Sequence, residues 1–311
     1  MIATLLPWTL FNLLVLVLLA IDLGIFHKKA HTIKLKEALI LSLIWTIVAL
    51  IFNVGIYFWK GSGPAVEFFT GYLIERSLSV DNLFVFLLAF QYFKIEGQYQ
   101  HKILYWGIVG ALVMRAIFIF SGVAIIEKFN WAMYLFGAFL IFTGVKMAFQ
   151  KDKEIHPENN PVLKLFKKIM PVTTEFNDGK FFKKIGRVFY ATPLFVVLIV
   201  IETTDVVFAV DSIPAILAIT RDAFIVYTSN VFAILGLRAL YFALAGIVDL
   251  FHYLNYGLAI ILSFIGVKML IVNFYKIPVG IALGVVGVIL ALSIVASVIW
   301  PKKGANLGGA V

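Results

Sequence analysis

The sequence predicts an all-α polytopic membrane protein with about nine transmembrane helices, which include an inverted three-helix repeat. Hydrophobic residues make up 62% of the 311 residues, charged residues only 14%, and the mean hydropathy is +1.01. A soluble domain has about 45–50% apolar and about 25% charged residues. Apolar runs of roughly 20 residues, the length that crosses a bilayer, recur along the whole chain. No sizeable soluble domain is therefore expected.

The apolar runs place spans at about 6–26, 37–59, 66–92, 103–126, 131–149, 190–219, 224–248, 252–272 and 277–300. We expect the first to be retained rather than cleaved, because no basic residue precedes it and no small-residue cleavage site follows it. The predicted organisation is two N-terminal helices (1–65), a first three-helix repeat (66–149), a basic cytoplasmic segment (150–189), a second, inverted repeat (190–272), and a last helix with a C-terminal tail (273–311).

The basic residues indicate topology rather than nucleic-acid binding, because they lie between the spans despite the formal net charge of +9. With the N-terminus outside and the C-terminus inside, the inner segments hold 17 Lys and Arg and the outer segments four. Nine of the 17 lie in 150–189. Within that segment, 161–170 fits either an amphipathic helix at the membrane interface or an ordinary cytoplasmic hairpin. The segment is also the predicted docking site of any protein partner.

The two halves resemble each other around their charged residues. "ERSLSVDN" (75–82) aligns with "DVVFAVDS" (205–212), and "GVKM" occurs at 144–147 and again at 266–269. Arg115 and Arg238 each stand alone in an apolar run. An odd number of spans in each copy inverts the second copy, an arrangement found in many secondary transporters, whose substrate sites lie near the bilayer midplane.

Six acids fall inside predicted spans beyond the first two residues of a span, where a carboxylate costs roughly 2.5–3.5 kcal/mol and usually marks an ion or proton path: Asp22, Glu75, Asp81, Glu202, Asp205 and Asp211. Pairing with Arg76, Arg115 and Arg238 is the structural alternative, but three arginines leave negative charge over. The chain has no cysteine, which excludes thiol redox chemistry and thiolate metal sites. All five histidines lie at or near span ends.

The interior ligands are therefore oxygens, which suit hard divalent ions such as Mn²⁺, Mg²⁺ and Ca²⁺. The candidate metal-site residues are Glu75, Asp81, Glu202, Asp205, Asp211, Asn82 and Ser212. Asp205 and Asp211 point about 120° apart on an ideal helix. Pro214 predicts either a break that turns Asp211 toward the others or a simple kink.

"GYLIERSLSVDNLFVF" and "IETTDVVFAVDSIPAI", with "TSNVFAILGLRALYF", resemble the TerC family of integral membrane proteins, in particular its Alx-like members. The resemblance covers about residues 19–300. It implies a multi-pass inner-membrane protein linked to Mn²⁺ export, in a family named for tellurium resistance, some of whose members are implicated in supplying Mn²⁺ to secreted enzymes. The family's acidic membrane residues correspond to Glu75, Asp81, Glu202, Asp205 and Asp211.

The expected function is Mn²⁺ efflux, driven by an ion gradient because the chain has no nucleotide-binding motif. The alternative is a membrane partner that hands metal to other proteins without transport. We expect no enzyme activity, since no G-x-G-D run of an intramembrane protease occurs. We expect no cofactor; Mn²⁺ is substrate, and lipid is the other partner.

Overall fold

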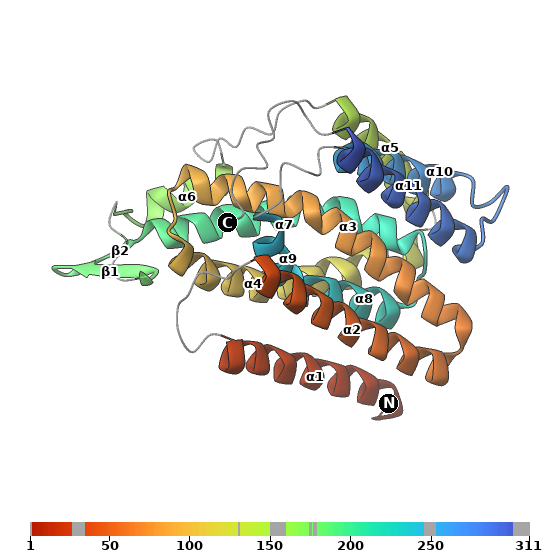
Figure 1. Cartoon of the computed structure of the whole chain (residues 1–311), viewed down its shortest axis with the longest axis horizontal. Coiled ribbons are helices and arrows are strands. Elements are labelled where there is room, and N and C mark those ends of the chain that lie inside the picture. Colours follow the sequence, from red (N-terminus) through yellow and green to blue (C-terminus); the bar gives the residue numbers. More distant parts are fainter. Residues whose placement is uncertain are drawn as a thin grey trace.

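The structure is a computed structural model that describes residues 2–26, 35–129, 131–149, 160–173, 176, 179–245 and 253–300. Its helices are α1 (Ile2–Phe26), α2 (Leu35–Lys60), α3 (Ser62–Tyr92), α4 (Gly97–Lys128), α5 (Ala132–Phe149), α6 (Pro161–Ile169), α7 (Pro193–Leu217), α8 (Ala223–Leu235), α9 (Leu237–Ala245), α10 (Leu254–Leu270) and α11 (Val279–Ile299). In Figure 1, α5, α10 and α11 lie together on one side, and α1 lies along the opposite side.

A helix, or a pair of helices, lies at each predicted span, which confirms a polytopic helical protein. Among the described residues, six helices are long and apolar enough to cross a membrane, or seven when the bent pair α8 and α9 is one span. α3 does not pass this test, although it has 31 residues, because it carries Glu67, Glu75, Arg76 and Asp81. α10 is apolar but has only 17 residues. Nine crossings therefore stay a prediction.

One part of the chain departs from the all-α prediction. The strands β1 (Phe182–Ile185) and β2 (Val188–Ala191) form an antiparallel hairpin, with a turn at Gly186, whose φ is +62°. Glycine adopts this conformation without steric cost. The hairpin extends beyond the ends of the neighbouring helices in Figure 1. The span predicted from residue 190 therefore begins only at Pro193, where proline suits the first helical turn.

The amphipathic segment 161–170 is confirmed as a helix, α6. Asn160 caps its first turn by accepting from the backbone N–H groups of Val162 (2.9 Å) and Leu163 (3.0 Å). Leu163 is buried, whereas Leu165 and Ile169 are 60% and 77% exposed. The helix thus exposes apolar side chains next to its lysines, as expected for a helix at the membrane interface.

The predicted break at Pro214 is wrong. α7 continues through this proline and ends only at Leu217, so the helix is unbroken at Asp211. The interruption lies instead at Gly236, where α8 and α9 meet at an angle of 41°. A Cβ at Gly236 would lie 2.1 Å from the Arg76 guanidinium, which also donates to the Ala233 carbonyl (3.3 Å). Arg76 therefore satisfies a carbonyl at the C-terminal end of α8.

The two predicted copies make reciprocal contacts. α4 packs on α7, α8 packs on α3, and α5 packs closely along α10. A Cβ on Gly144 would lie 2.6 Å from the Ala259 carbonyl oxygen, and one on Gly266 would lie 2.6 Å from the Gly137 carbonyl oxygen. When the two GVKM motifs are aligned, Gly144 corresponds to Gly266 and Gly137 to Ala259, so each of these contacts corresponds to the other. Small residues at such crossings let helix backbones approach closely in a membrane.

The buried apolar residues form two clusters with a charged layer between them. Along α4, one cluster runs from Ile103 to Ala111 and the other from Ile119 to Ile126. Along α7, they run over residues 194–201 and 209–217. Arg115 and Asp205 lie in the gaps, near the middle of these helices. These two helices therefore place Arg115 and Asp205 at a similar depth, between the apolar clusters.

Replacing Gly144 or Gly266 by alanine should destabilise the protein, because the added methyl group has no room between α5 and α10. Overpacking typically costs about 1–3 kcal/mol. Gly287→Ala in α11 is the matched control, since nothing lies within 4 Å of its Cβ position. Thermal unfolding in detergent should show a lower midpoint for the first two variants alone. Equal midpoints for all three would contradict this packing.

Candidate metal site

Arg115 lies at the centre of the charged layer and bridges both predicted copies. Its side chain is completely buried and forms an ion pair with Glu75, which is also fully buried. Its other terminal nitrogen lies 3.5 Å from a carboxylate oxygen of Asp205. The nitrogen that contacts Glu75, Nη1, also donates to Ser212 Oγ and Asn230 Oδ1, both at 2.9 Å. Four helices, α3, α4, α7 and α8, therefore meet around one guanidinium.

Helix periodicity explains why these groups meet. Asp205 and Ser212 are seven residues apart on α7, which places them on one face two turns apart. Glu75 and Asn82 have the same spacing on α3, and Asn82 is also buried. Asn230 was not a predicted site residue. Its position in the first copy is Gly107, so the repeat gave no signal for it.

Both carboxylates keep one oxygen unused. Glu75 Oε2 and Asp205 Oδ2 are buried without a hydrogen-bond partner among the described residues, and so is Arg115 Nε. The 3.5 Å distance to Asp205 is long for a charged hydrogen bond, so this acid is held more loosely than Glu75. With all three groups ionised, the cluster carries one formal negative charge. It therefore offers free oxygen ligands to a cation.

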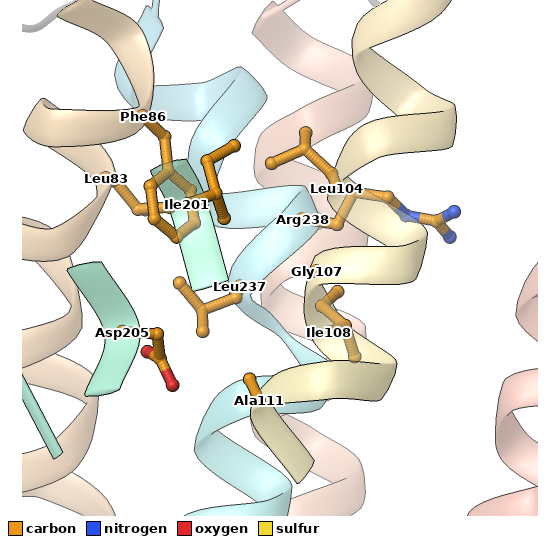
Figure 2. Close-up of a pocket in the computed structure, with 10 residues that line it drawn as sticks. All are labelled: Leu83, Phe86, Leu104, Gly107, Ile108, Ala111, Ile201, Asp205, Leu237 and Arg238. Carbon is orange, nitrogen blue, oxygen red and sulfur yellow. The ribbon is translucent and has the colours of Figure 1, made fainter. Parts of the chain in front are cut away.

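A small cavity of about 10 Å³ adjoins Asp205. Figure 2 shows the carboxylate beneath a group of apolar side chains that includes Leu83, Phe86 and Ile201. This space is about the smallest that holds one water molecule. The apolar group closes the charged layer on this side, so the site is occluded here.

Arg238, the counterpart of Arg115 in the second copy, has a different partner. Its guanidinium points away from Asp205, past α4, in Figure 2. It forms an ion pair with Asp22 of α1, and both side chains are buried. Asp22 is thereby neutralised by an arginine. This agrees with the alternative that the buried acids serve to pair with arginines. Arg76 has Ser42 Oγ (2.7 Å) and the Ala233 carbonyl as its described partners instead.

The remaining candidates lie apart from this cluster. Asp211 accepts a hydrogen bond from Thr143 of α5 (3.1 Å). Glu202 lies against Gly110 on α4, at the edge of a groove. Asp81 is within α3, but its side chain lies outside the described residues. No group of three or more His, Cys, Asp and Glu suited to a metal ion occurs in the described part of the chain. Of the seven predicted residues, Glu75, Asp205 and Ser212 come together.

The fold and this buried cluster define the class of the protein: a multi-span integral membrane protein with ionisable groups in its helical core. The sequence model of the "Integral membrane protein TerC family" matches residues 60–305. The chain therefore belongs to the TerC family, as its motifs predicted.

Several proteins are similar to this chain over nearly their whole length. A Myxococcus xanthus protein called uncharacterized membrane protein STKORF319 is 49% identical over 292 residues, covering 94% of this chain and 92% of that protein. The Escherichia coli (strain K12) protein called putative membrane-bound redox modulator Alx is 46% identical over 303 residues, covering 94% of each. No solved structure matches the chain.

Replacing Arg115 by methionine should lower the free energy of unfolding by about 3–5 kcal/mol, because Glu75 and Asp205 would stay buried without their counter-ion. Adding Glu75→Gln and Asp205→Asn should restore part of this loss. Arg221→Met is the control, since the described partner of Arg221 is only Met133 Sδ at 3.7 Å. Unfolding in mixed detergent measures all of these variants. No recovery in the triple variant would show that charge pairing is not the cause.

Proposed function

We propose that this protein exports Mn²⁺ across the inner membrane through the charged layer around Arg115, driven by an ion gradient. The observation that carries the proposal is the buried pair Glu75 and Asp205, one from each predicted copy, with an unpartnered oxygen on each. Oxygen ligands of this kind suit a hard divalent cation. Manganese itself is proposed from the family resemblance.

In the transport hypothesis, the Arg115 guanidinium occupies the site that the transported cation would take. In the described arrangement the guanidinium balances one of the two carboxylate charges. Mn²⁺ would bind through the second oxygens of Glu75 and Asp205 and would displace Arg115 from Asp205 first, because that contact is longer. Ser212 and Asn82 lie two turns along the same helix faces, so they would be neutral ligands at the next positions of the path. Asp81, Asp211 and Glu202 would extend the acidic path. Protons on the same acids would couple Mn²⁺ efflux to proton entry.

The inverted repeat belongs to this proposal. The exchange of the Gly144–Ala259 and Gly266–Gly137 contacts supports a two-fold relation between the copies. The relation is incomplete, because α4 is continuous while its counterpart is broken into α8 and α9. In a transporter that rocks one repeat against the other, such a break is a hinge. The proposed orientation has the N-terminus outside and the C-terminus inside.

Mn²⁺ flux into proteoliposomes should saturate for the wild type and fall at least tenfold in Glu75→Gln and Asp205→Asn, because each loses a proposed ligand. We expect the same loss in Asp81→Asn and Asp211→Asn. Glu127→Gln is the control, since Glu127 is exposed at the end of α4. No flux in the folded wild type would refute export. Flux that ignores an imposed pH gradient would refute the proton coupling alone.

Metal delivery to a partner is the second candidate, with no transport by this chain. The projecting hairpin favours it, because Val188 and Phe189 are 49% and 54% exposed beside Lys183, Lys184 and Arg187. The name of the relatives, redox modulator, is compatible with both candidate functions, because each would change the supply of metal. The 311 residues contain no thiol, so an effect on redox state would pass through metal supply rather than through cysteines of this chain. No described feature bears on tellurite.

Replacing residues 184–189 by glycine and serine separates the two candidates. If the protein exports Mn²⁺ by itself, flux in proteoliposomes should stay within about twofold of wild type, because the hairpin lies outside the charged layer. A scrambled hairpin of the same composition controls for folding. Intact Mn²⁺ binding with lost metal supply in cells, and no flux in either protein, would favour delivery.

A further inference from the structure

A groove of about 850 Å³ lies between α4, α7 and the start of α6. Its volume falls within the range of roughly 300–1,000 Å³ that is usual for small-molecule sites. The walls are mostly apolar and include Val109, Val113, Met114, Val162, Val206 and Val207. The groove is separate from the occluded cavity beside Asp205.

The groove opens on the surface that the spans present to lipid. Val113 and Val207 lie near the middle of α4 and α7, and their side chains are 57% and 62% exposed. Val162 of α6, at the end of the groove, is 48% exposed. A ligand would therefore enter from the hydrocarbon region rather than from water.

The uncharged polar groups in the groove are already engaged. Thr203 donates to the Ile199 carbonyl (2.7 Å) and Thr204 to the Val200 carbonyl (2.6 Å). The Asn160 amide donates to Thr203 Oγ1 (2.7 Å), and its oxygen caps α6. These groups therefore offer little to a neutral polar ligand.

Glu202 is the exception. Its carboxylate has no ion pair or hydrogen bond to another described residue, and the group that acts on it electrostatically is another acid, Asp205. A Cβ at Gly110 would lie 2.0 Å from Glu202 Oε1, so the carboxylate rests on the bare backbone of α4. An acid at this depth is costly without a cation.

We propose that this groove binds a lipophilic organic cation, whose positive centre pairs with Glu202 and whose apolar body fills the valine-lined walls. A divalent ion would only pass this groove and would not be held there, since one carboxylate cannot replace the water that the ion would lose on binding. The inference rests on the shape of the groove and the charge of Glu202, and it stands whether or not Mn²⁺ passes this acid.

Tetraphenylphosphonium is the probe, measured by equilibrium dialysis against the purified full chain in lipid nanodiscs. We expect saturable binding of one cation per chain, at least tenfold weaker in Glu202→Gln, which keeps the size of the side chain but removes its charge. Val207→Trp should also weaken binding, because it fills the groove from an exposed position. Glu127→Gln is the matched control and should bind as the wild type does.

Neutral triphenylphosphine oxide tests whether charge is the reason. It has a similar aryl body and should not displace tetraphenylphosphonium from the wild type. Equal binding by the wild type and Glu202→Gln, both with unchanged thermal unfolding, would overturn the proposal. Equal competition by the neutral compound would also overturn it. So would the finding that a second copy of the chain covers the groove and that no saturable binding occurs. None of these results depends on whether Mn²⁺ is transported.

Discussion

The buried contact of Arg115 with Glu75 and Asp205 is the interaction around which this fold is organised. A single guanidinium without exposure to solvent joins a helix of the first predicted copy to one of the second. Removing one partner of such a pair leaves an uncompensated buried charge, which is far more costly than the pair itself. The two apolar clusters on either side leave a gap for these charges and for little else.

The same contact constrains how the protein would move an ion. The guanidinium balances one of the two carboxylate charges in this arrangement, and the apolar side chains above Asp205 close the cavity. Any cation that uses these acids has to compete with Arg115. The break at Gly236, with Arg76 against it, lies six residues after Asn230 and two before Arg238 along the same span. A change in the angle between α8 and α9 would therefore reach the charged layer directly.

Hydropathy predicted most of the helices, because an apolar run is a local pattern. The repeat alignment put Glu75 and Asp205 at matching positions of the two copies, and the structure brings both to Arg115. These sequence patterns did not predict the partners of the arginines. Arg115 and Arg238 look equivalent in the sequence, yet Arg238 binds Asp22, which lies outside the repeat. The sequence patterns also left open a break or a simple kink at Pro214 and gave no signal for the bend at Gly236. That bend depends on tertiary packing, because the Arg76 guanidinium lies where a side chain at this position would be.

The most direct test is to locate Mn²⁺ in the protein by anomalous scattering at the manganese edge, in crystals grown with the ion. The account predicts a peak between Glu75 and Asp205, with the Arg115 guanidinium moved away from Asp205. A manganese peak elsewhere, with the contacts of Arg115 to both acids intact, would contradict it. In that case the cluster around Arg115 would be a structural ion pair, and the ion's path would lie along other acids.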